Sequence, residues 1–137
     1  MIDLTVLVGK YLKEKMFADD DSEIQALANI IYVDSEIGKA QKKISLMTAG
    51  GVDDDVNPKT ELDLQVICTD TSIAKAKDMA KVVFKFLDGL YDEPFTFDEV
   101  DISFSSTSTS IIIPLGNIGG GNYAVNQHFK IIQGDVR

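Results

Sequence analysis

Three consecutive aspartates, Asp53, Asp54 and Asp55, form the densest group of side chains in this sequence that could do chemistry. Carboxylates grouped on a loop are ligands that Mg²⁺ and Ca²⁺ accept. A calcium loop, however, also needs acidic residues at alternate positions, an interior glycine and a distal glutamate. Those features are missing here, and the run at Asp19–Asp21 lacks them too. Both runs therefore favour solvated loops, and no metal ion is predicted.

Cys68 and His128 are the only cysteine and the only histidine of the chain. A thiol and an imidazole can act as nucleophile and base, but only where they lie within hydrogen-bond reach. Each falls in a segment that reads as a strand, so they meet only if the two strands adjoin in the right register. We expect both to be structural, with Cys68 acting as a small buried hydrophobic residue. No catalytic residue and no cofactor is predicted.

Gly119, Gly120 and Gly121 could suggest a loop that holds a phosphate group. Such a loop lies between a strand and a helix and usually carries a lysine followed by serine or threonine. Here Asn122 and Tyr123 follow, and they open a strand-like alternation instead of a helix. The glycines therefore indicate the tip of a hairpin, which is able to become ordered on contact with a partner.

Lys77, Lys81 and Lys85 recur at the spacing of one helical face. Such a stripe could bind DNA or an acidic surface, although Asp78 dilutes it. A solvated helix face is the ordinary interpretation. The alternative is contact with the Asp53–Asp55 loop of an adjacent copy. Exposed ion pairs contribute only about 0–1 kcal/mol each, so they would set orientation more than they would hold an assembly together.

The chain has 137 residues and a net charge of −9, which indicates one acidic domain spanning 1–137. This charge argues against gripping a nucleic-acid backbone, because phosphate binding depends on lysine and arginine. It is compatible with a surface along which DNA slides without sticking. The N-terminal segment lacks the basic region of a signal peptide, and no apolar run approaches the roughly 20 residues of a membrane span. We expect a protein of the cytoplasm with no membrane partner.

Apolar periodicity predicts the secondary structure. Asp3 is a candidate cap for a helix that reaches about Phe17, and a second long helix is expected over Ser72–Asp88. A short helical piece is expected near Glu23–Ala28. Gly50 and Gly51 read as a turn in a loop, Pro94 begins a further turn, and Ser105–Ser110 either extends a strand or forms a loop. Strands are expected at Ile30–Val33, Lys43–Thr48, Thr60–Thr69, Val100–Phe104 and Tyr123–Ile131.

These elements indicate an α+β fold, with a mainly antiparallel β-sheet and two α-helices packed on one face. The glycine-rich turn favours antiparallel pairing of the strands on either side of it. With both helices on one face, we expect the other face of the sheet to be covered by a neighbouring subunit.

The order of elements resembles the small tail-terminator and minor capsid proteins of long-tailed bacteriophages, which join head to tail. The likeness covers most of the chain. Its segments are MIDLTVLVGKYLKEK, IIYV, the strand ending in TAGG, ELDLQVICTDTSIAKAKDMAKVVFKFLDGL and NYAVNQHFKII. The Asp19–Asn29 stretch and the three aspartates depart from the pattern of that family.

This resemblance implies a non-enzymatic virion protein that is assembled in the host cytoplasm. It implies a ring, commonly of six copies, that caps the tail tube and contacts tail-tube and head-completion proteins. DNA would pass through that ring without specific binding. The hairpin segments near Ser105–Ser110 and Gly119–Gly121 would face the lumen or a neighbouring ring.

Two other classes of function stay open. One is a small adaptor or regulatory module that binds a protein partner through a sheet edge. The other is an enzyme or metal-binding domain that uses Asp53–Asp55 and His128.

Overall fold

A computed structural model describes residues 4–33, 42–53, 60–87, 93–97, 100–108 and 111–136. Three helices occur among them: α1 (Leu4–Phe17), α2 (Ser22–Ala28) and α3 (Ile73–Leu87). All three lie within about a residue of the segments that the sequence predicts. The side-chain oxygen of Asp21 accepts a hydrogen bond from the backbone N of Glu23 at 2.9 Å, and that of Ser72 accepts one from Lys75 at 3.2 Å. These polar side chains explain where α2 and α3 begin.

The strands form one seven-stranded sheet over the described residues. Its order is β1-β2-β3-β7-β5-β4, and β6 pairs with β7 off this path. Every described pairing is antiparallel except that of β1 with β2. The strands are β1 (Ile31–Val33), β2 (Lys43–Asp53), β3 (Thr60–Asp70), β4 (Glu93–Phe97), β5 (Val100–Ser108), β6 (Ile113–Gly119) and β7 (Asn122–Val136).

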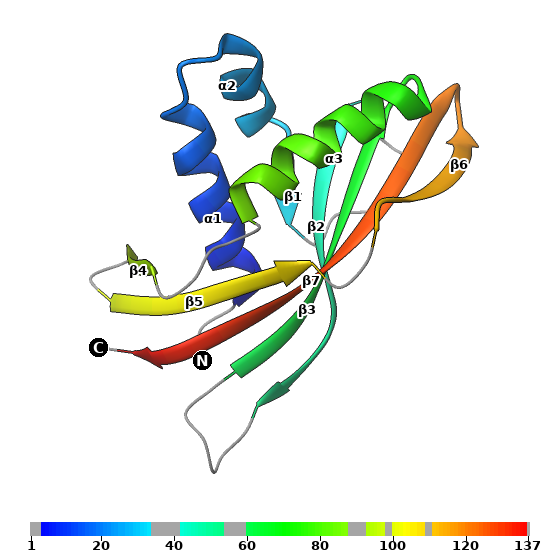
Figure 1. Ribbon diagram of the computed structural model, residues 1–137. Coiled ribbons are helices and arrows are strands. Elements are labelled where there is room, and N and C mark those ends of the chain that lie inside the picture. The colour runs from blue at the N-terminus through cyan, green and yellow to red at the C-terminus, as the bar shows by residue number, and fades with distance from the viewer. Residues whose placement is uncertain are drawn as a thin grey trace.

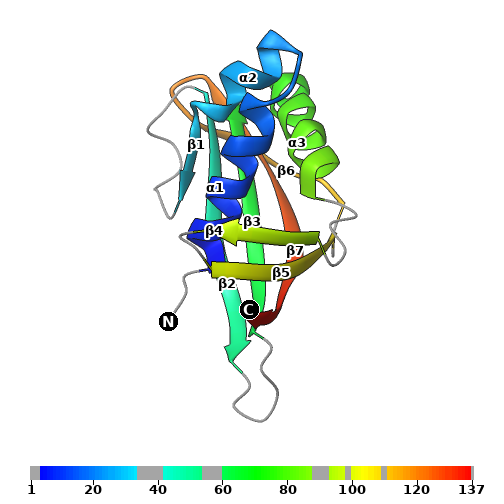
Figure 2. The same ribbon diagram turned by 90° about the vertical axis from the view of Figure 1, so that its left-hand side faces the viewer.

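Helices α1 and α3 contact each other and lie on the same face of the sheet, while α2 packs on α1 (Figures 1 and 2). The α+β fold with a mainly antiparallel sheet and its main helices on one face is therefore confirmed. Strand β7 is long enough to pair with β6 along its first part and with β5 along its second part. Figure 1 shows β5 and β6 leaving β7 in different directions.

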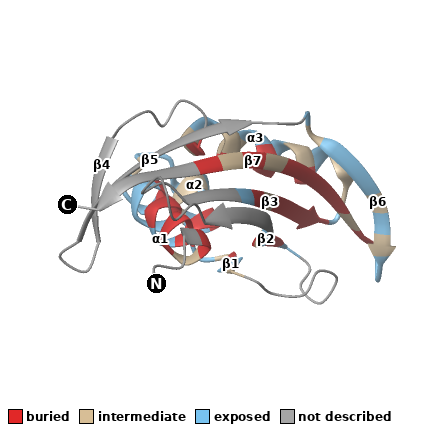
Figure 3. Cartoon of the chain, turned by 90° about the horizontal axis from the view of Figure 1, so that it is seen from below, coloured by how far each residue is buried: buried red, intermediate tan, exposed pale blue. Residues whose placement is uncertain are grey.

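The core lies between the helices and the inward face of the sheet. Leu64, Val66 and Cys68 alternate along β3 and are buried there, as the period of two predicts. Phe129 of β7 is also fully buried, and its ring centroid lies 6.3 Å from that of Phe84 on α3. Figure 3 shows the buried positions following β3 and β7, whereas β6 is exposed or half-buried.

Two local predictions were wrong, and one strand was missed. Gly50 and Gly51 lie inside β2, opposite Asp63 and Leu62, and do not form a turn. The register of β2 shifts between Thr48 and Gly50, and this bulge allows the ladder to continue through the glycines. The segment after Pro94 belongs to β4, and Ile113–Gly119 forms β6, for which no strand was predicted.

The face of the sheet that points away from the helices is partly buried within the single chain. Lys43 of this face is buried, and its Nζ lies 5.6 Å from the ring centroid of Tyr32. Contact between this face and a neighbouring subunit stays a prediction. Other described residues of this face that are buried include Ser45, Ile67, Thr69, Ala124 and Asn126.

Candidate assembly surfaces

An exposed apolar stripe begins just before β6 and continues into its first residues. Ile111 is 81% exposed, Ile113 42% and Leu115 44%. They are three of the five large hydrophobic residues found exposed in the described part of the chain. Ile112, between the first two, packs against the core. The alternation therefore anchors the segment through Ile112 and presents the stripe to solvent.

Two irregularities shape β6. Its register against β7 shifts between Pro114 and Gly116, and again between Asn117 and Gly119. Each shift places an extra residue on β6, which bends the strand and increases its twist. Gly116 adopts a φ of 83° at the first shift. A strand that bends in this way is a poor template for the regular addition of another strand.

The predicted hairpin tip joins β6 to β7. Gly119, Gly120 and Gly121 have φ values of 105°, 63° and 77°, a region that favours glycine. The side-chain oxygen of Asn117 accepts a hydrogen bond from the backbone N of Gly119 at 2.8 Å. Because strand β7 follows the glycines, the hairpin interpretation is confirmed and the phosphate loop is not.

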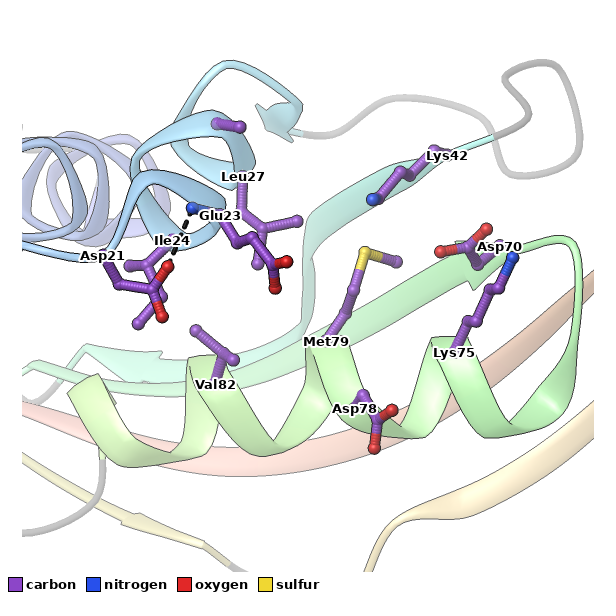
Figure 4. A pocket seen from close by; sticks show the side chains of 11 residues that line it. Asp21, Glu23, Ile24, Leu27, Lys42, Asp70, Lys75, Asp78, Met79 and Val82 are labelled. Carbon is purple, nitrogen blue, oxygen red and sulfur yellow. Dashed lines mark hydrogen bonds between the residues drawn. The ribbon is translucent and has the colours of Figure 1, made fainter.

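A cleft of about 510 Å³ lies between α2 and α3 (Figure 4). Its lining includes the apolar side chains of Ile24, Leu27, Met79 and Val82. The charged residues around it are Asp21, Glu23, Lys42, Asp70, Lys75 and Asp78. With four acidic and two basic groups, the rim is acidic on balance, so the cleft suits an apolar or cationic occupant over an anionic one.

Two acidic rim residues also serve local structure. Asp21 caps α2 through its side chain. Asp70 is buried, and its side-chain oxygen accepts a hydrogen bond from the backbone N of Thr71 at 2.6 Å. These bonds hold the turns that lead into α2 and α3, the two helices that flank the cleft. The acidic run at Asp19–Asp21 therefore has a capping role.

The predicted lysine stripe lies on α3. Lys81 and Lys85 are exposed and Lys77 is half-buried. Nζ of Lys85 lies 5.8 Å from the ring centroid of Phe86. Asp53 is the last residue of β2 and pairs with Thr60, whereas Asp54 and Asp55 lie outside the described residues. A contact between this stripe and the three aspartates of another copy remains a prediction.

Cys68 and His128 do not form a pair. Cys68 lies opposite Val125 and faces the core, whereas His128 lies opposite Gln65 and alternates to the other face. Nε2 of His128 lies 3.2 Å from Nδ2 of Asn126. Burial raises the pKa of the Cys68 thiol to about 12, which makes it a poor nucleophile near neutral pH. This geometry provides no Cys–His catalytic pair.

Within the described residues, no group of three or more histidine, cysteine, aspartate or glutamate side chains is placed to hold a metal ion. None of the described helices combines the length and the apolar character needed to cross a membrane.

Sequence reasoning missed the β6 stripe and the α2–α3 cleft. The stripe has a signal in the sequence, because no aspartate, glutamate, lysine or arginine occurs from Ile102 to Phe129. The uncharged segment includes the exposed stripe, although its second half is largely buried in β7. The cleft joins residues from α2, β3, α3 and Lys42 just before β2, and its existence depends on how these segments pack.

The fold has a counterpart along nearly its whole length. A chain in a structure described as the virion of a native gene transfer agent particle matches with a TM-score of 0.60 and 15% sequence identity, over 92% of this chain and 94% of that one. A second solved chain matches with a TM-score of 0.49 and 12% identity, over 98% and 97%, which is too weak to bear on function. No family model and no curated protein matches the sequence. The likeness at 15% identity shows the fold alone.

Proposed function

We propose that this chain is a non-enzymatic structural protein of a phage or phage-like virion. The observation that carries the proposal is the match in fold to a chain of a gene transfer agent virion, which covers both chains almost completely. The separation of Cys68 from His128 supports a role without catalysis. An exposed apolar stripe supports a role in assembly, because such patches on soluble proteins commonly mark interaction sites.

Within the virion, we place the chain as a tail terminator that forms a ring at the head–tail junction. The ring caps the tail tube, contacts tail-tube and head-completion proteins, and lets DNA pass without specific binding. The order of elements from TAGG through the helix that ends at Leu87 supports this placement. The net charge of −9 supports free passage of DNA, because like charges repel.

Ring closure needs two different surfaces on each copy. We propose that the Asp53–Asp55 segment of one copy approaches Lys77, Lys81 and Lys85 of the next. The Gly119–Gly121 tip contacts a neighbouring copy or ring. The ion pairs contribute orientation, and packing of apolar side chains supplies most of the affinity.

Electron microscopy of the full chain tests this function. The chain is imaged alone and after mixing with tail tubes assembled from the tube protein of the same genome. Rings at one end of each tube, and an arrest of further tube growth, are expected. Tubes mixed with an unrelated acidic protein of similar size serve as the control. A chain that stays monomeric and leaves tube ends bare would contradict the proposal, and a complex with one non-virion protein would favour the adaptor.

The rival metal-binding function has its own test. Thermal unfolding is measured with Mg²⁺, with Ca²⁺ and with EDTA. A structural protein without a metal site gives the same melting temperature in all three conditions. A ligand that binds only the folded state raises that temperature, so a clear rise with either ion would support the rival.

A further inference from the structure

We infer that the α2–α3 cleft binds a basic amphipathic segment of another protein. The segment places apolar side chains between the two helices and lysine or arginine side chains against the acidic part of the rim. A groove that takes the apolar face of a helix is a recurring mode of peptide recognition. Such binding requires neither a ring nor a virion, so it goes beyond the proposed function.

The floor of the cleft is apolar because each flanking helix contributes a pair of hydrophobic residues. Ile24 and Leu27 lie one turn apart on α2, and Met79 and Val82 lie one turn apart on α3. Residues at this spacing share one face of a helix. The volume of about 510 Å³ is within the range of ligand-binding pockets, roughly 300–1,000 Å³. Met79 adds an unbranched side chain that adapts to the shape of an occupant.

Charge is distributed unevenly around the cleft. Lys42 directly precedes β2 and Lys75 lies in the first turn of α3, so both lysines lie at the same end as Asp70, the last residue of β3. Asp21 and Glu23 of α2 lie toward the other end (Figure 4). The lysines therefore offset the carboxylate at their own end, and the part of the rim formed by α2 is acidic.

The acidic part of the rim favours a cationic occupant. Glu23 on α2 and Asp78 on α3 are exposed, so an occupant of the cleft can reach both carboxylates. Opposite charges attract more strongly beside an apolar floor than in open water. The net charge of −9 draws a basic partner toward the chain and repels an acidic one. A lysine or arginine fits this geometry, because its methylene stem packs on apolar surface while its charge stays at the rim.

Synthetic peptides test the chemistry of the occupant. The probe, a fluorescein-labelled peptide with leucine at helical spacing and lysine elsewhere, is titrated with the full chain and followed by fluorescence anisotropy. One matched peptide has glutamate in place of lysine, and another has serine in place of leucine. The leucine–lysine peptide should bind roughly tenfold tighter than either, or more. Equal affinity for the glutamate peptide would overturn the cationic occupant, and equal affinity for the serine peptide would overturn the apolar floor as its site.

Charge reversal tests whether the peptide binds at the cleft. Glu23→Lys and Glu14→Lys make the same change in net charge, and both residues are exposed. Glu23 lines the cleft, whereas Glu14 of α1 does not. Glu23→Lys should weaken binding of the leucine–lysine peptide by roughly tenfold, and Glu14→Lys by less than about twofold. Equal losses in the two variants would mean that the peptide is attracted to the whole acidic chain, which would overturn the cleft as the site.

Filling the cleft gives a test that leaves the charge unchanged. Ala26 lines the cleft and Ala74 of α3 does not, and both are exposed, so the fold tolerates tryptophan at either position. Ala26→Trp should lower the affinity for the leucine–lysine peptide by roughly tenfold, because it occupies apolar surface that the peptide would cover. Ala74→Trp should leave that affinity unchanged. Thermal unfolding checks that both variants fold.

The remaining outcomes are equally decisive. The leucine–lysine peptide should raise the melting temperature of the wild type, because a ligand that binds only the folded state stabilises it. Unchanged affinity in Ala26→Trp, or no binding of the leucine–lysine peptide by the wild type, would overturn the inference. Either result would leave the proposed ring standing, because electron microscopy with tail tubes tests the ring separately.

Discussion

Gly9 on α1 lies so close to Val33 on β1 that a Cβ atom on Gly9 would be 2.9 Å from Cγ2 of Val33. The same atom would be 3.5 Å from Cδ1 of Leu46, an ordinary contact. The absence of a side chain at Gly9 therefore sets how closely α1 approaches the edge of the sheet. Helix α1 in turn supports α2 and one wall of the cleft.

Gly9→Ala should lower the free energy of unfolding by roughly 1 kcal/mol, because overpacking outweighs the better helix propensity of alanine. In a Val33→Ala background, the clashing methyl group is gone and the same substitution should raise that free energy. Chemical denaturation of the four proteins in the cycle checks the change of sign. Equal effects of Gly9→Ala in both backgrounds would contradict the close contact.

Cys68 should give stability a pH dependence on the alkaline side. Burial raises the pKa of its thiol from an ordinary value of 9.0 to about 12. Between these values the unfolded chain loses a proton that the folded chain keeps, so rising pH favours unfolding. The contribution of this group falls by about 1.4 kcal/mol per pH unit in that window and is constant below it.

Denaturation of the wild type and of Cys68→Ala between pH 7 and alkaline pH isolates this effect, since other groups titrate equally in both proteins. The excess free energy of unfolding of the wild type over Cys68→Ala should be constant up to about pH 9 and then decrease. If the stability difference between the wild type and Cys68→Ala stays constant at higher pH, then burial does not raise the pKa of the Cys68 thiol.

The sequence predicts well the elements whose period is regular. The segment Thr60–Thr69 alternates cleanly as far as Val66 and matches β3 within one residue, and the helix expected over Ser72–Asp88 is α3. Predictions failed where pairing overrides local propensity. Gly50 and Gly51 favour a turn by residue type, but the ladder with β3 holds them in β2. Strand β6 was not predicted because Pro114 and its glycines are atypical of a strand. The structure accommodates them because β6 is bulged.

The candidate surfaces were harder to predict than the elements. The position of the Gly119–Gly121 tip follows from glycine chemistry, and the structure confirms it as a hairpin. Side chains from distant segments form the cleft, for example Leu27 and Val82, and no local pattern links them. The register that separates Cys68 from His128 could not be read from spacing either, because register depends on the whole ladder.

The hairpin tip should tolerate asparagine better than branched residues. At Gly121 a Cβ atom would meet nothing within 4 Å, so any cost comes from the backbone, whose φ is 77°. Gly121→Val should lower the free energy of unfolding by about 1–2 kcal/mol. Gly121→Asn should cost clearly less, because asparagine adopts this conformation more readily. Thermal unfolding of both variants makes the comparison, and equal losses would argue against the left-handed turn.

The lysine stripe should affect assembly and not folding. Reversing the charge at Lys77, Lys81 and Lys85 to glutamate should change the free energy of unfolding by only about 0.5 kcal/mol, because none of the three is buried: Lys81 and Lys85 are exposed and Lys77 is half-buried. If they meet the Asp53–Asp55 segment of the next copy, the variant should assemble more weakly and lose sensitivity to salt. Lys13→Glu, on the exposed side of α1, is the control. Sedimentation at low and high salt gives the readout, and unchanged assembly would remove the stripe from the interface.

The copy number of the assembled chain tests the virion ring most directly. Native mass spectrometry of the full chain, over a wide range of protein concentration, measures that number. A ring predicts one closed species of fixed mass, six copies by the resemblance to tail terminators, with few intermediates between it and the monomer. A monomer at every concentration, unchanged when tail tubes are added, would contradict it.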